Sequence, residues 1–110
     1  MHVGAFVAAH FGFEVQIDNT GYPDGAPKHT TGAIYDIEDQ QFGRVAPRPV
    51  GEWNDYRIRV VGQVYEVVLN DLPATRFENH DAGRGAALGF VGIQTHSGNV
   101  AFRDVRIRAL

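Results

Sequence analysis

Two short polar pairs are the best candidates for chemistry in this chain of 110 residues. Glu14 and Gln16 form the first pair, and Gln94 and His96 form the second. The spacing of two places both members of a pair on the same face of a β-strand. A carboxylate and an imidazole can transfer protons, whereas an amide only forms hydrogen bonds. Glu14 and His96 are therefore candidates for acid–base chemistry, and Gln16 and Gln94 for binding hydroxyl groups.

These candidates also have simpler interpretations. Glu14 would be a solvated strand residue, and His96 would be a hydrogen-bonding residue of a hairpin. Trp53, the only tryptophan, offers a flat ring for stacking on a ligand, but a core anchor at the start of a strand is its simpler role. Asn70 could bind a ligand, although Asn70-Asp71 is typical of a tight turn. Tyr35 fits either the core or a site.

Several kinds of site are excluded by residue content. The chain has no cysteine, and Ser97 is its only serine, so disulfides, thiolate metal sites and cysteine or serine nucleophiles are not expected. No two histidines have a spacing typical of metal ligands, and we predict neither a metal nor a cofactor. Glu14 and Asp18 are four residues apart, roughly 13 Å along a strand. That separation exceeds the roughly 6.5–9.5 Å between the carboxylates of an inverting glycosidase. Asp36 and Glu38, roughly 6.6 Å apart by the same rise, could just meet this distance, but no further glycosidase-like acidic spacing follows them and we interpret them as solvated.

The charge balance gives no reason to expect a polyanionic partner. Ten basic and 13 acidic residues leave a net charge of −3, so we expect neither nucleic acid nor an anionic membrane as a partner. No signal peptide or membrane-spanning segment is visible, and the compartment stays open. For Arg103 we expect an ion pair with a carboxylate of the sheet.

The elements that would position these side chains are β-strands. Apolar and polar residues alternate, as in a strand with one buried face, over residues 13–17, 55–60, 64–69, 91–96 and 105–108. Turn signals lie at Gly62-Gln63, Asn70-Asp71 and Ser97-Gly98-Asn99. We predict an all-β domain of about six antiparallel strands, with a meander over 55–77 and a hairpin over 89–108.

A long connection over residues 18–32 is rich in glycine and proline. A loop of this length in a compact domain is usually functional or mobile. Lys28 and His29 lie in this loop, where they would either cover a site or be solvated.

Six short motifs occur in the order seen in one known family. The chain resembles the 3-keto-disaccharide hydrolase domain family over nearly all of its length. The motifs are Gly12-Phe-Glu-Val-Gln-Ile17, Thr31-Gly-Ala-Ile-Tyr35, Gly51-Glu-Trp-Asn54, Leu69-Asn70, Gly92-Ile-Gln-Thr-His96 and Phe102-Arg-Asp-Val-Arg-Ile107.

The resemblance implies an antiparallel, concanavalin A-like jelly-roll sandwich that cleaves glycosides with a ketone at C3. Such a ketone acidifies the C2 hydrogen, so a base can remove it, the anomeric oxygen can leave, and water can add to the enone. We then predict catalytic roles for Glu14 and His96 and substrate-binding roles for Gln16, Tyr35, Trp53, Asn70 and Gln94. The alternative is a non-catalytic carbohydrate-binding or structural β-sandwich module.

The resemblance covers only the C-terminal part of the family domain. We therefore expect residues 1–110 to form a single, partial domain, a truncated jelly roll. An incomplete sandwich leaves an apolar sheet face uncovered, so we expect a homodimer or a complementing chain that supplies the missing strands. The expected ligand is a carbohydrate, and the family would allow a secreted or periplasmic parent protein.

Overall fold

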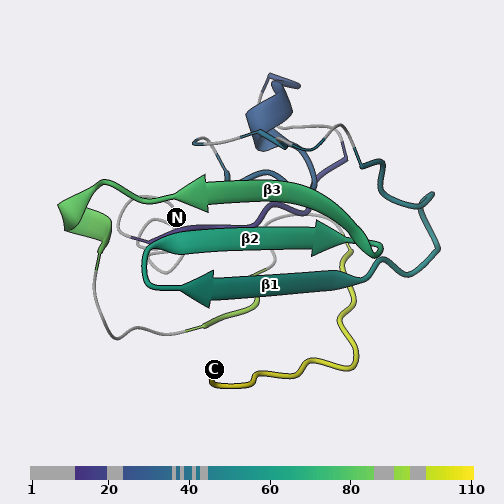
Figure 1. The fold of residues 1–110 in the computed structure, drawn as a ribbon. Helices are drawn as coiled ribbons and strands as arrows, with labels where there is room; N and C mark the ends of the chain where they lie inside the picture. Colours follow the sequence, from purple (N-terminus) through teal and green to yellow (C-terminus); the bar gives the residue numbers. More distant parts are fainter. Residues whose placement is uncertain are drawn as a thin grey trace.

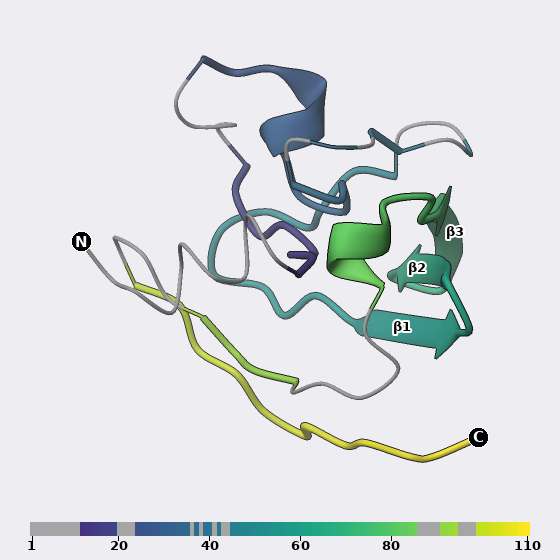
Figure 2. The same ribbon diagram turned by 90° about the vertical axis from the view of Figure 1, so that its left-hand side faces the viewer.

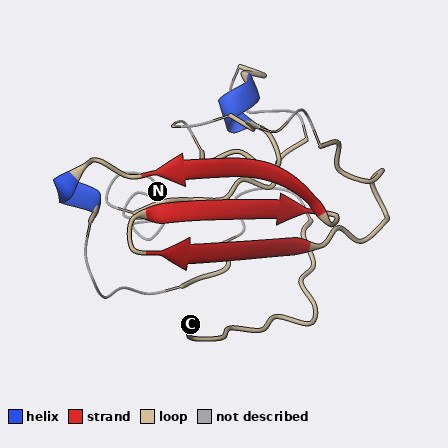
Figure 3. Cartoon of the chain, viewed as in Figure 1, coloured by secondary structure: helices blue, strands red, loops and turns tan. Residues whose placement is uncertain are grey.

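The fold is built on a three-stranded antiparallel meander. The computed structural model describes residues 12–19, 24–35, 37, 39–40, 42, 45–85, 91–94 and 99–110. Its strands are β1 (Tyr56–Val61), β2 (Val64–Leu69) and β3 (Leu72–Glu78), in the order β1-β2-β3 (Figures 1 and 3). The meander predicted over 55–77 and the all-β class are confirmed.

Helical structure within these residues is limited to two short 3₁₀ turns. They are η1 (Pro27–His29) and η2 (Ala82–Arg84), the latter following the end of β3 in Figure 1. No helix in the described ranges is long and apolar enough to cross a membrane.

Both hairpins of the meander close through two-residue turns, as predicted. Val61 pairs with Val64 across Gly62-Gln63, and Leu69 pairs with Leu72 across Asn70-Asp71. Gly62 has φ of 59°, and Asn70 and Asp71 have φ of 50° and 65°. Positive φ at these positions matches the right-handed twist of the flanking strands, and Gly, Asn and Asp tolerate it best.

One face of the meander carries the hydrophobic core. The buried residues of this core are Ile34, Val45, Val67, Leu69 and Ala74. Phe13 packs against it, with its ring centroid 4.7 Å from that of Tyr65 and 5.3 Å from that of Phe77. Strand β1 contributes little to this core: only Tyr56 packs against it, and Ile58 and Val60 are both nearly half exposed.

A short pairing between two loop-like segments covers this core. Val15 and Ile34 form an isolated antiparallel bridge. Backbone hydrogen bonds from Tyr35 N to Glu14 O (2.8 Å) and from Gln16 N to Ala33 O (2.9 Å) flank it. The strand predicted over 13–17 is therefore a single bridge rather than a regular strand. Its apolar alternation still holds in part, since Phe13 and Val15 pack on the core while Ile17 is exposed.

The loop over residues 18–32 is anchored where it is described. Thr31 Oγ1 accepts a hydrogen bond from Asp18 N at 3.0 Å, and Thr75 Oγ1 donates one to Gly32 O at 2.8 Å. His29, Thr31 and Thr75 are all buried. The C-terminal part of the loop is thus packed against β3.

The hairpin predicted over 89–108 does not appear in the described residues of that region. Residues 91–94 and 99–110 hold no strand, and the 99–110 segment runs outside the sheet (Figure 2). The described residues therefore contain three strands rather than the expected six. The physical reason is that apolar side chains such as Val91 and Ile107, more than 70% exposed, have no buried sheet face to pack on. The Ser97-Gly98 turn lies outside the described residues.

Candidate functional site

Glu14, Gln16 and Tyr35, three of the predicted site residues, lie on one face of the bridge. The pairing of Val15 with Ile34 places Glu14 opposite Tyr35. Directly opposed residues of an antiparallel pair point to the same face, and residues two apart share it. The core takes the other face, through Val15 and Ile34. Oε1 of Glu14 is buried from solvent. This surface, formed by Glu14, Gln16 and Tyr35 together with the loop residues Asp24 and His29, is called the polar face below.

A histidine–aspartate pair from the long loop stands beside this face. His29 Nδ1 and Asp24 Oδ1 are 2.7 Å apart, and His29 is only 6% exposed. The hydrogen bond from the Ala26 N–H, followed by that from His29, lowers the pKa of Asp24. An ionised carboxylate on Nδ1 fixes the orientation of an imidazole.

Two contacts connect His29 to the predicted residues. Gln16 Nε2 donates a hydrogen bond to His29 O at 3.3 Å. The ring centroids of His29 and Tyr35 are 5.1 Å apart. The structure thus brings together Gln16, Tyr35, His29 and Asp24, with Glu14 on the same face.

The sequence placed His29 only in a loop. The signal that could have singled it out is the proline at the start of a tight turn, since Pro27 opens η1 and Pro suits the first position of a helical turn. That turn returns the chain so that Asp24 and His29 meet. The five-residue spacing of Asp24 and His29 does not by itself predict that their side chains meet.

Tyr56 ties the meander to the polar face. Its hydroxyl donates a hydrogen bond to Gln16 O at 2.7 Å. Burial raises the pKa of Tyr56 well above its usual range, so the phenol stays protonated. A protonated phenol is the form that can donate this bond, which fixes the backbone beneath Gln16.

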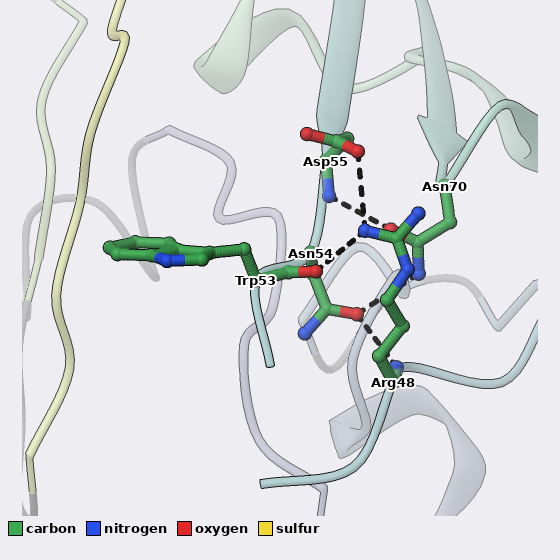
Figure 4. Close-up of polar contacts among 5 residues, drawn as sticks. All are labelled: Arg48, Trp53, Asn54, Asp55 and Asn70. Carbon is green, nitrogen blue, oxygen red and sulfur yellow. Dashed lines mark hydrogen bonds and ion pairs between the residues drawn. The ribbon is translucent and has the colours of Figure 1, made fainter. Parts of the chain in front are cut away.

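A second polar cluster surrounds Arg48, at the start of β1 (Figure 4). The Arg48 guanidinium donates a hydrogen bond to Trp53 O at 2.6 Å and lies 3.3 Å from the Asp55 carboxylate. Arg48 N donates to Asn54 Oδ1 at 2.7 Å. Asn70 Nδ2 donates to the same Asn54 oxygen at 2.9 Å.

Asn70 also joins β1 to the β2–β3 turn through its backbone and side chain. Asp55 N donates to Asn70 Oδ1, and Asn70 N donates to Asp55 O, both at 2.8 Å. The side chain of Asn70 is therefore engaged in holding the turn, as its simpler interpretation expected.

Trp53 is not a core anchor. Its side chain extends away from the Arg48 cluster in Figure 4 and is 41% exposed. The Arg103 guanidinium lies over the indole, 4.0 Å from the ring centroid. A cation over the face of an indole is attracted by the ring quadrupole. Arg103 therefore makes a cation–π contact with Trp53, whereas the sequence led us to expect an ion pair with a carboxylate.

The other predicted residues that the structure describes lie outside the polar face. Gln94 is exposed in the 91–94 segment, and His96 lies outside the described residues. Trp53 and Asn70 belong to the region around Arg48 rather than to the polar face. Within the described ranges, no group of three or more His, Asp or Glu side chains is arranged to hold a metal ion.

The comparison with protein families identifies the class of domain. The family described as 3-keto-alpha-glucoside-1,2-lyase-like domain matches residues 4–108. The match spans almost the whole chain, which therefore belongs to that family. No curated protein and no solved structure gives a significant match.

Proposed function

We propose that this chain is a carbohydrate-active domain that cleaves 3-keto-glycosides. The match to the lyase-like family over residues 4–108 carries the proposal. The polar face supports it, because Glu14, Gln16 and Tyr35 share one side of the bridge, next to the His29–Asp24 pair.

The proposed reaction starts at the carbon next to the ketone. A base removes the C2 proton, and the electron pair is delocalised onto the C3 oxygen as an enolate. The enolate then expels the anomeric oxygen, which takes a proton and leaves as the alcohol, and an enone remains. Water adds to C1 of the enone, and a proton returns to C2. The sum is hydrolysis without net oxidation or reduction.

We assign the roles on the polar face by chemistry. Glu14 is the base for the C2 proton, because Asp24, the other carboxylate of the polar face, is held by hydrogen bonds from Ala26 N and His29. Gln16 and Tyr35 bind sugar hydroxyls. The His29 imidazole, oriented by Asp24, is a second proton-holding group beside Tyr35. His96 stays a predicted acid–base residue.

We also propose the finer fold that the resemblance implies. The meander would be part of one sheet of a concanavalin A-like jelly roll, and the 91–110 region would supply further strands once its apolar residues are covered. Assembly with a second copy or a complementing chain stays a prediction, and sedimentation at several protein concentrations tests it.

The direct experiment compares Glu14→Gln with Glu52→Gln. The assay measures reducing sugar released from a 3-keto-disaccharide. Glu14→Gln should lower the rate by about 10²–10⁴-fold, the usual contribution of a general base. Glu52 is exposed in the 45–55 loop, so Glu52→Gln should retain the wild-type rate. Equal rates for the two variants would remove Glu14 from the mechanism.

A second candidate function is sugar binding without turnover. The exposed indole of Trp53 favours it, because sugar C–H faces pack on such rings. Titration with oligosaccharides, followed by Trp53 fluorescence, distinguishes the two candidates. Saturable binding without product would support the binding module, and product release would support the enzyme.

A further inference from the structure

A hollow of about 370 Å³ lies at the C-terminal end of β3, away from the residues assigned above. Its apolar lining comes from Phe13, Ile37 and Phe77. The chain continues along its rim through residues 78–81 and into η2. The volume is at the small end of the range for ligand sites, about 300–1,000 Å³. It therefore suits a ligand of one or two rings.

The apolar lining is preformed by ring packing. The rings of Phe13 and Phe77 meet edge to face, with their centroids 5.3 Å apart. The ring centroid of Tyr65 lies 4.7 Å from that of Phe13. The Arg84 guanidinium lies 5.6 Å from the centroid of the Phe13 ring. Asp81 approaches the Arg84 Nε at 3.7 Å. Because these contacts fix the rings, little side-chain ordering is needed when a ligand binds.

Buried Asn79 holds the backbone of the rim. Its Nδ2 donates to Gln63 Oε1 at 2.7 Å, and its Oδ1 accepts from Asp81 N at 2.9 Å. In the described part of the chain, the side chains of Glu78 and His80 are exposed and enter no hydrogen bond or ion pair. The rim thus combines a rigid backbone with two polar side chains that are available to a ligand.

The charges select the class of ligand. Glu78 and Asp81 are acidic and Arg84 is basic, so the rim carries a net negative charge when His80 is neutral. Such a rim repels phosphates and sugar acids. Metal binding is not favoured either, because no set of three suitable ligands occurs in the described ranges. Carboxylates, imidazole and guanidinium together offer acceptors and donors for hydroxyl groups.

We propose that this hollow, the β3-end pocket, binds the ring of a neutral sugar. The C–H face of the sugar packs on Phe13 and Phe77, and its hydroxyls bond to Glu78 and His80. The choice of a sugar rests on the proposed carbohydrate function. The pocket would hold a part of the substrate remote from the reacting carbon, or a second saccharide.

The test is a titration of isotope-labelled protein with methyl α-glucopyranoside, followed by the amide resonances of residues 77–85. Saturable shifts confined to these residues and to Phe13 and Ile37 are expected. Glucuronic acid should bind more weakly, because its carboxylate meets an acidic rim. Glu78→Ala and His80→Ala should each weaken binding about fivefold, the value of a hydrogen bond of about 1 kcal/mol. Glu52→Ala, which removes an exposed carboxylate from another loop, should have no effect.

Absence of shifts at residues 77–85 would overturn the proposal, as would tighter binding of glucuronic acid or equal affinities for Glu78→Ala, His80→Ala and Glu52→Ala. Circular dichroism verifies that the variants are folded.

The binding test can be distinguished from the test of the proposed reaction. Loss of activity in Glu14→Gln with the pocket still binding supports both proposals. An inactive wild-type protein with a working pocket overturns only the proposed reaction, and an active protein with no pocket binding overturns only the pocket.

Discussion

The meander and the C-terminal segment differ sharply in environment although both contain alternating apolar residues. In the meander, Val67 and Leu69 are at most 1% exposed. In the 99–110 segment, Val105 and Ile107 are 59% and 75% exposed. The meander is held by two-residue turns and paired neighbours, whereas the described C-terminal residues form no strand. Alternation therefore gives a strand only where a partner strand and a covered face are present.

The alternation of the C-terminal segment also changes phase. Phe102 and Val105 lie three positions apart in the sequence rather than two, and Asp104, between them, has φ of 52°. A left-handed residue interrupts a strand, as a bulge does. Phe102 and Ile107 would otherwise point to opposite faces. By contrast, the meander has its left-handed residues in its turns.

Leu69→Ala and Ile107→Ala give the largest contrast between the two regions. Leu69→Ala should lower the free energy of unfolding by about 2–5 kcal/mol, because it empties a buried site. Ile107→Ala should change it by less than about 0.5 kcal/mol. Urea denaturation followed by circular dichroism measures both. Similar losses in the two variants would mean that Ile107 is buried in solution.

Asn70→Ala tests the turn. It removes the hydrogen bonds to Asp55 and Asn54 and places Ala at positive φ, which should cost about 2 kcal/mol. Asn70→Gly keeps the backbone conformation accessible and should recover part of the loss. Asp104→Ala is the matched change in the C-terminal segment, and it should cost less, because no hairpin depends on it. The urea midpoints rank the three variants. Equal midpoints for Asn70→Ala and Asn70→Gly would show that the positive φ of residue 70 does not contribute to the loss of stability.

Tyr56 gives the meander a dependence on alkaline pH. Its pKa is raised in the folded state by burial, so its contribution is complete below the unfolded value near 10. Above about pH 10 the unfolded phenol ionises first, and stability falls by up to about 1.4 kcal/mol per pH unit. Tyr56→Phe should remove this part of the pH dependence and cost about 1 kcal/mol at neutral pH. An unchanged alkaline profile in that variant would assign the effect to other groups, among which Tyr65 also has a pKa raised by burial.

The contact of Arg103 with Trp53 should make only a small contribution to stability. Arg103→Ala should cost about 0.5–1 kcal/mol, the value of an exposed cation–π pair. It should also change the Trp53 emission, because the guanidinium leaves the ring face. Arg106→Ala is a matched control in the same segment. If both variants leave the emission unchanged, the 99–110 segment does not rest on Trp53 in solution.

The candidate site could be predicted only in part. The alternation over residues 13–17 put Glu14 and Gln16 on a face opposite the core, and the bridge of Val15 with Ile34 agrees with that. It did not show that Tyr35 would lie against His29, or that Asp24 would hold the imidazole. Both contacts depend on the path of a long loop. Loop paths are set by packing and hydrogen bonds between residues distant in sequence, so no local pattern encodes them.

The sequence by itself determined the all-β class, the meander, both of its turns and the family. The all-β class, the meander and its turns rest on nearest-neighbour physics, namely the period of two and the tolerance of Gly62, Asn70 and Asp71 for positive φ. The family rests instead on the order of the sequence motifs and on the match over residues 4–108. The tertiary structure alone decided that Trp53 is exposed beneath Arg103 and that the described C-terminal residues form no strand. Burial and strand pairing require a second surface in contact, and a one-dimensional pattern does not specify where that surface lies.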